Sequence, residues 1–209
     1  MKYRYLWAVV TFLVILLYSC SGKAPKSSDT ISVTPDPTPE LPVEDVMDAQ
    51  LTARGILPIK VGMRIVDISP AEENLYDSIS TEKGYESNTY HFYLDNEERF
   101  TAYEFEAGTV SMVAANNESI VVKTGTDGMI RIGDPFVKVA KLPGVKAQWE
   151  TGDDDGIWVW IWQGIRFIPD QSNLPDNLVH KMYNSTVAPQ ASDFTPEVTV
   201  SYMGTGLPW

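Results

Sequence analysis

Apolar and polar positions change their pattern twice along the chain. Residues 5–18 are continuously apolar, and after Cys20 a segment rich in Pro, Ser, Thr and Asp runs to about residue 42. From about residue 56 onward, short apolar runs alternate with glycine turns, a pattern typical of short strands and helices. We therefore expect a leader (residues 1–19), a linker with one short helix ended by Gly55 (20–55), and a folded region.

The leader has the features of a secretion signal. Lys2 and Arg4 precede an apolar core of 14 residues, which is shorter than the ~20 residues that a membrane-spanning helix needs. The alternative is an uncleaved membrane anchor. The small Ser19 and the abrupt change to polar sequence after Cys20 favour cleavage.

The sequence "LYSC" around Cys20 resembles the lipobox of bacterial lipoproteins. The resemblance implies that the signal is removed before Cys20, that its thiol is diacylated and that its new amino group is acylated. Several acyl chains make such an anchor stable. Cys20 is the only cysteine, so a disulfide has no second partner in the chain. Ser21 in place of Asp implies, by resemblance, an outer membrane lipoprotein; its periplasmic or cell-surface face stays open.

An internal repeat organises the folded region. Residues 59–68 and 130–139 match in their apolar, basic and glycine positions, with Gly62 and Gly133 lying 71 positions apart. Each copy predicts an apolar lead, a glycine turn and a short helix with proline in its first turn, which begins near Ser69 in the first copy and near Asp134 in the second. Strands are expected to follow at 89–94, 99–113 and 119–126, and at 156–163, 165–169 and 197–206. We expect an α+β fold of two tandem repeats (56–126 and 127–209), each with short helices and a small antiparallel sheet. A single irregular β-sandwich is the alternative.

The motifs "VGM", "IGDPFVKV", "WVWIWQGIRF" and "GTGLPW" resemble those of tandem-repeat lipoproteins of unknown function found in Bacteroidetes. More distantly, the pattern resembles the beta-lactamase-inhibitor-protein-like fold, which is shared with a small lipoprotein of the outer-membrane barrel-assembly machinery. The resemblance implies a fold rather than an activity. The two-repeat inhibitors carry cysteine pairs within their repeats and this chain has none there, which argues against an inhibitor role.

The most distinctive candidate surface is a stripe of tryptophans. In a strand, Trp158, Trp160 and Trp162 share one face and the intervening aliphatic residues share the other. We assign the aliphatic face to the helices. The indoles then form either ordinary core or a surface for a partner, and the pattern favours the two equally.

The first repeat offers a related surface, with a clearer division between its two faces. Tyr103 and Phe105 are expected on one face of a strand, and Glu104 and Glu106 on the other. Together with the three tryptophans, Tyr103 and Phe105 are our candidate partner-binding residues.

Charge narrows the classes of partner. The chain has a net charge of −12, which becomes −14 when Lys2 and Arg4 leave with the leader. Such a chain is expected to be repelled by nucleic acid and by anionic membrane surfaces. The expected partner is therefore a basic or neutral protein or a carbohydrate, with no nucleic acid.

No motif indicates catalysis. His91 and His180 lie in separate segments without a neighbouring nucleophile pattern, and residues 153–156 (DDDG) lack the alternating ligands of a calcium loop, so a solvated turn is favoured. We expect no catalytic residues, metal or cofactor.

The predicted function is an envelope binding module for protein through an aromatic sheet surface. The alternatives are glycan binding and a hydrolase with dispersed carboxylates. Thr30 is a candidate O-glycosylation site by resemblance to a short motif.

Overall fold

A computed structural model describes residues 48–206, apart from residues 86, 126–127, 152–155, 173 and 185. Strands hold 47% of the described residues and helices 11%, so the fold is α+β in the broad sense but mostly β. The leader, Cys20, Thr30 and the acidic turn at 153–155 lie outside the described residues. What the sequence predicts for them stays a prediction.

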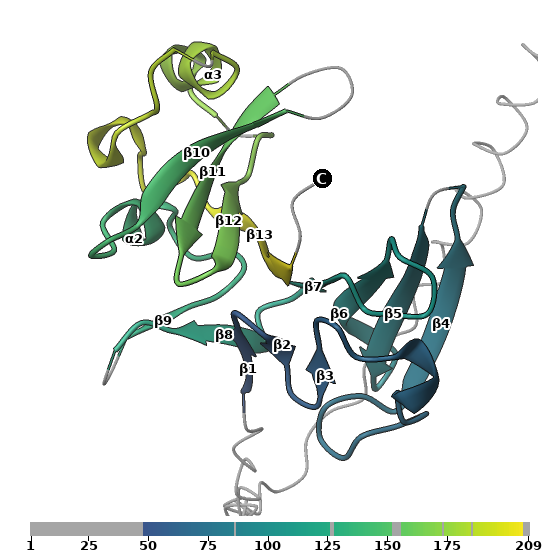
Figure 1. The fold of residues 1–209 in the computed structure, drawn as a ribbon. Coiled ribbons are helices and arrows are strands. Elements are labelled where there is room, and N and C mark those ends of the chain that lie inside the picture. The colour runs from purple at the N-terminus through teal and green to yellow at the C-terminus, as the bar shows by residue number, and fades with distance from the viewer. Residues whose placement is uncertain are drawn as a thin grey trace, which may run out of the picture. The chain divides into compact units, whose positions relative to one another are not determined.

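Eight antiparallel strands form the larger sheet, in the order β10-β11-β12-β13-β7-β6-β5-β4 (Figure 1). One half consists of β4 (Ser78–Lys83), β5 (Asn88–Leu94), β6 (Glu97–Glu104) and β7 (Met112–Ala115). The other half consists of β10 (Lys146–Thr151), β11 (Gly156–Trp162), β12 (Ile165–Pro169) and β13 (Val200–Gly206). The halves are joined where β7 pairs with β13.

A second, smaller sheet has five short strands in the order β3-β2-β1-β8-β9. They are β1 (Ala49–Thr52), β2 (Gly55–Ile56), β3 (Ile59–Lys60), β8 (Ile120–Lys123) and β9 (Met129–Ile130). The helices are short as well: η2 (Ile65–Asp67), α2 (Val137–Ala140), α3 (Asp176–Met182) and η3 (Ala191–Asp193). β1 and β8 pair in parallel.

The larger sheet has a covered face that builds the core. The strand registers align one row of side chains on this face across all eight strands: Ile79, Phe92, Phe100, Ala115, Met203, Phe167, Trp160 and Ala147. Tyr76 packs edge-on against Phe92 at one end of the row, with ring centroids 4.9 Å apart. At the other end, Phe136 and Phe194 pack against Trp160. The segments that carry η2, α2 and η3 therefore lie on this side of the sheet.

The opposite face carries a different row across the same eight strands: Ser80, His91, Thr101, Ala114, Gly204, Arg166, Ile161 and Lys146. Its two central members, Ala114 and Gly204, face each other across the β7–β13 pairing. A Cβ added at Gly204 would lie 2.2 Å from the Tyr202 hydroxyl oxygen, so the tyrosine ring lies over the glycine. Small residues thus hold the middle of this face.

The two glycine turns of the sequence motif make matching hydrogen bonds. Gly62 and Gly133 both have positive φ values, +82° and +86°. The N–H of Gly62 donates to the Val110 carbonyl (2.7 Å), and the N–H of Gly133 donates to the Val200 carbonyl (2.8 Å). Three residues after each glycine, the N–H of Ile65 and that of Phe136 donate to carbonyls at matching positions of the same two segments. The predicted glycine turns are confirmed.

Two predicted helices are wrong. Ala49–Thr52, expected to be helical, forms strand β1, because it pairs with β2 on one side and β8 on the other. The helix expected to begin near Ser69 is absent; the described helix of that repeat is η2, which ends at Asp67. Ser69 Oγ donates to the Ala71 carbonyl, so it does not cap a helix. Long-range strand pairing overrides these local signals.

The sheet arrangement also differs from the expectation of one small sheet per repeat. Strands of both halves form one continuous eight-stranded sheet, and β8, expected among the strands of the first repeat, belongs to the five-stranded sheet. The edge strands β4 and β10 were not predicted. Their sequences, SISTEK and KAQWET, are largely polar because they have a neighbour on one side only.

Candidate functional site

The tryptophan stripe of β11 lies on the covered face of the large sheet. Trp158, Trp160 and Trp162 are only 9%, 3% and 8% exposed. Trp160 packs edge-on against both Phe136 and Phe194, with ring centroids 5.0 Å and 5.2 Å away. The expectation that these three indoles form an exposed aromatic surface is corrected by this burial, which places them in the core.

The two faces of β11 lie the opposite way round from the prediction, and the reason is physical. A buried indole N–H needs an acceptor, and the loops on the helical side supply one. Trp158 Nε1 donates to the Asn184 carbonyl (2.8 Å) and Trp162 Nε1 donates to the Pro143 carbonyl (3.1 Å). The aliphatic residues of β11 lie on the opposite face, where no such acceptor is required.

Tyr103 and Phe105, the remaining candidates, lie together. Their rings stack with centroids 6.1 Å apart and planes 4° apart, which confirms that they share a face. Phe105 is 39% exposed. Tyr103 pairs with Met112 of β7, and the hydroxyl of Tyr202 lies 3.3 Å from the Met112 sulfur. We call Tyr103, Phe105, Met112 and Tyr202 the aromatic patch of the opposite face.

An ion pair adjoins the aromatic patch. Arg166 Nε lies 3.1 Å from Glu150 Oε1, and the two side chains are 13% and 7% exposed. Arg166 also donates to the Gly206 carbonyl (2.6 Å). Arg166 pairs with Ile161 and Glu150 with Ile157 on either side of β11, so the ion pair crosses that strand at Val159, which is 1% exposed.

Two polar groups of this region are unusual in their environment. Glu150 Oε2 is buried and has no hydrogen-bond partner among the described residues. Burial raises the pKa of the Tyr202 phenol, with a smaller contribution from neighbouring Tyr103. A buried carboxylate oxygen without a partner is costly, and a donor brought by a ligand would relieve that cost. No sequence pattern pointed to Glu150, because its strand was not predicted.

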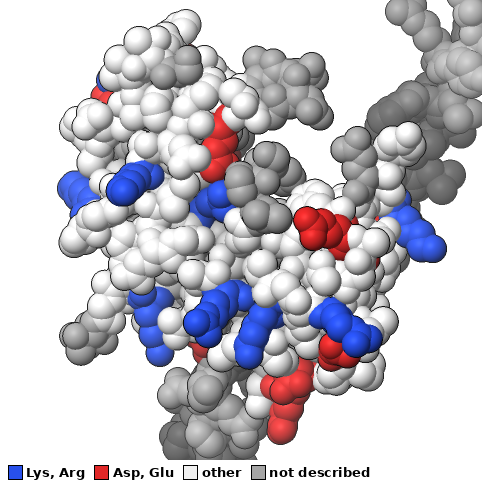
Figure 2. Space-filling view, viewed as in Figure 1, with Lys and Arg blue, Asp and Glu red and all other residues white. Residues whose placement is uncertain are grey.

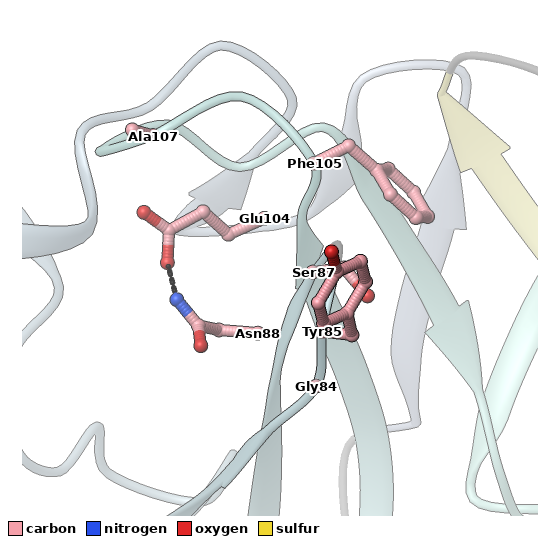
Figure 3. A pocket seen from close by; sticks show the side chains of 7 residues that line it. All are labelled: Gly84, Tyr85, Ser87, Asn88, Glu104, Phe105 and Ala107. Carbon is pink, nitrogen blue, oxygen red and sulfur yellow. Dashed lines mark hydrogen bonds between the residues drawn. The ribbon is translucent and has the colours of Figure 1, made fainter.

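A shallow pocket opens beside Phe105, between the β4–β5 turn and the loop after β6 (Figure 3). Its volume is about 240 Å³, and its lining includes Tyr85, Asn88 and Glu104. Glu104 Oε2 accepts hydrogen bonds from Asn88 Nδ2 (2.8 Å) and the Tyr90 hydroxyl (2.7 Å). Its other oxygen accepts the N–H of Gly108.

These contacts fix the charge state of the pocket. Hydrogen bonds from Asn88, from the Gly108 N–H and from Tyr90 hold the pKa of Glu104 below its ordinary value. Burial, together with the hydrogen bond and the charge of Glu104, raises the pKa of Tyr90 to about 12. Glu104 is therefore an ionised acceptor with both oxygens engaged, and it is poorly suited to donate a proton.

The described residues hold no group of three or more His, Cys, Asp and Glu side chains placed to bind a metal ion. His91 Nδ1 lies 2.9 Å from Glu98 Oε1, and His180 is part of α3. None of the helices from residue 48 onward that the structure describes has the length and apolar character to cross a membrane.

Comparisons with known proteins give one structural likeness. The uncharacterized protein yfeY from Escherichia coli is similar with 13% identity and a TM-score of 0.47, over 76% of this chain and 99% of that one. No family model and no curated protein matches the chain. The resemblance to Bacteroidetes tandem-repeat lipoproteins and to the beta-lactamase-inhibitor-protein-like fold stays a prediction.

Replacing Trp160 by alanine tests its place in the core. We expect Trp160→Ala to lower the free energy of unfolding by about 3–5 kcal/mol, since it opens a large cavity beside Phe136 and Phe194. Val66→Ala is the control, because Val66 is 74% exposed and its loss should change stability by less than about 0.5 kcal/mol. Denaturant unfolding measures both. Equal, small effects would show that Trp160 is not a core residue.

Replacing Glu104 by glutamine tests the ionised acceptor. The lowered pKa of Glu104 means that its contribution to stability is complete above its unfolded pKa, near 4.5, and is lost as the pH falls through the folded pKa. Glu104→Gln should cost about 1 kcal/mol at pH 7, and the difference from the parent should shrink towards pH 2. A difference that does not change with pH, in unfolding curves recorded across this range, would contradict the assignment.

Proposed function

We propose that the protein is a lipid-anchored binding module of the cell envelope, which binds another protein through the aromatic patch of its large sheet. The observation that carries the proposal is the stacked pair of Tyr103 and Phe105 on the face opposite the helices, with Phe105 39% exposed. Rigid aromatic side chains next to a polar rim are typical of residues that dominate binding energy at protein interfaces.

The neighbouring ion pair supports the choice of a protein partner. Among the described residues, Glu150 Oε2 is buried without a hydrogen-bond partner, so a docked chain that displaces the groups covering it would gain a charge-assisted bond with little competition from water. The negative charge of the mature chain favours a partner that presents basic side chains or backbone N–H groups. Aromatic contact area and a polar acceptor together fit a protein surface.

The proposed architecture is a pair of tandem units, 56–126 and 127–209, behind a linker. Support comes from the matching hydrogen bonds after Gly62 and Gly133. It also comes from the β7–β13 register, in which Ala114 pairs with Gly204 and Val113 with Thr205. Residues 113 and 203 are 90 positions apart, and so are residues 115 and 205. Exchanging the two units therefore turns the pair Val113–Thr205 into the pair Ala115–Met203, which is also present.

Glycan binding is the second candidate, and the pocket beside Phe105 supports it. Tyr85 is fully exposed at its rim, and Asn88 and Glu104 supply polar groups at its wall. An aromatic ring beside planar polar side chains suits a sugar ring. A hydrolase has weaker support, because both oxygens of Glu104 are already hydrogen-bonded and a catalytic acid must be able to give up its proton.

The lipid anchor is tested at Cys20. We expect Cys20→Ala to abolish incorporation of radiolabelled palmitate and to change the distribution of the chain in fractionated cells, because the thiol is the expected attachment point. Ser21→Ala is the matched control and should keep the label. A Cys20→Ala chain that is labelled as strongly as the parent would overturn the anchor.

The binding surface is tested by photo-crosslinking in the cells of origin. A photoreactive residue at position 105 should give a discrete protein adduct that a residue at position 187 does not give, since Val187 is exposed but lies outside the patch. Tyr103→Ala should weaken the position-105 adduct, in line with a loss of about 1–2 kcal/mol of binding energy.

Two outcomes of the crosslinking experiment count against protein binding. An identical adduct pattern at both positions would show that the patch is not a specific surface. A glycan-array signal that Phe105→Ala abolishes, in the absence of a protein adduct, would replace protein binding by glycan binding.

A further inference from the structure

The five-stranded sheet has an exposed basic face, although the chain as a whole is acidic. Lys60 pairs with Gly55, and Gly55 pairs with Thr52. The parallel register of β1 and β8 places Thr52 beside Lys123. Lys60 and Lys123 therefore lie in one row on the same face, separated only by the small residues Gly55 and Thr52. The other face of this sheet carries buried core residues: Leu51, Ile56, Ile59, Val122 and Ile130.

Two exposed arginines lie in loops next to this sheet. Arg54, in the turn between β1 and β2, and Arg64, just after β3, are both exposed. Arg64 lies 3.7 Å from Asp67 in an exposed ion pair. Among the described residues, the side chains of Arg54, Lys60 and Lys123 make no ion pair. Figure 2 shows several Lys and Arg side chains over the region of β1–β3 and β8, with Asp and Glu side chains beside them. We call these four residues the basic patch.

The linker enters the fold on the sheet that carries the basic patch. The described chain begins at Asp48, and β1 follows at once as the central strand of the five-stranded sheet. In the sequence, fewer than 30 residues separate Cys20 from β1. An extended linker of this length reaches at most ~90 Å at ~3.1 Å per residue. A globule on such a tether meets the bilayer at a high effective concentration, so weak surface attraction is sufficient for docking.

We propose that the basic patch docks the folded region on the anionic headgroups of a lipid bilayer. Lys60 and Lys123 lie three strand spacings apart, or ~14 Å. Charges beyond the Debye length of ~8–10 Å are largely screened at physiological salt. A bilayer that contacts this face is therefore attracted mainly by the cations of the basic patch. The acidic side chains that lie farther from the bilayer than the Debye length repel it only weakly. The inference rests on the proposed lipid anchor for its cellular setting, but headgroup recognition itself needs no acyl chain.

This inference changes the expectation drawn from composition. A net charge of −14 for the mature chain predicts repulsion from an anionic membrane, because it treats the charge as evenly distributed. The four residues of the basic patch come from positions 54–64 and 123, and strand pairing brings them together on one sheet. Local charge then decides the interaction with a flat anionic surface.

Vesicle sedimentation tests the proposal. The mature chain without its leader (residues 20–209), carrying Cys20→Ala and so lacking the acylated thiol, is mixed with phosphatidylcholine vesicles with and without phosphatidylglycerol. We expect binding to the anionic vesicles that falls as salt is raised. Lys60→Glu with Lys123→Glu should weaken it by about 30-fold or more. Lys83→Glu with Lys146→Glu, two exposed lysines outside the patch, makes the same change in net charge and should have a much smaller effect.

Several outcomes would overturn the docking surface. These are equal losses for the two double variants, equal binding to neutral and anionic vesicles, or complete competition by inorganic phosphate, which would indicate a site for a small anion. Unfolding curves of each variant show whether it folds. If the Lys60→Glu, Lys123→Glu variant does not fold, Lys60→Gln with Lys123→Gln replaces it in the vesicle assay. Loss of the Cys20 anchor would appear in palmitate labelling and leave this assay unchanged, so the two failures are distinguishable.

Discussion

The antiparallel pairing of β7 with β13 is the contact on which the rest of the structure depends. It joins two four-stranded groups into one sheet, so that a single row of side chains runs from Ile79 to Ala147 across eight strands. Without that pairing, each group would expose an unpaired central edge, which is a template for aggregation. The pairing also divides the molecule into a covered face that builds the core and an opposite face that remains for contact.

The covered face explains why the tryptophans of β11 are core residues. Indoles bury the largest area of any side chain, and the short helices of this protein supply little apolar surface of their own. The three indoles, with Phe136 and Phe194, fill the space that longer helices would occupy elsewhere. Once the aromatic bulk is placed there, the opposite face is left with Tyr103, Phe105 and a crossing ion pair.

Much of the strand pattern could be predicted from the sequence. The segment 165–169 coincides with β12, and the glycine turns at Gly62 and Gly133 are present as expected. Patterns failed where a partner distant in sequence decided the outcome. Ala49–Thr52 became a strand because β8 lies beside it, and the tryptophan stripe was assigned to the wrong side because both faces of its strand are apolar. The Glu150–Arg166 pair joins two strands that flank a third, so no local pattern contains it.

The central row of the opposite face is asymmetric in its side chains. Arg166 pairs with Gly204 on one side of the β7–β13 contact, and Thr101 pairs with Ala114 on the other. The backbone is nearly symmetric about this point, but one side presents a guanidinium and the other a buried hydroxyl. The two halves of this face are therefore chemically inequivalent, and a group that contacts both would meet a cation on one side only.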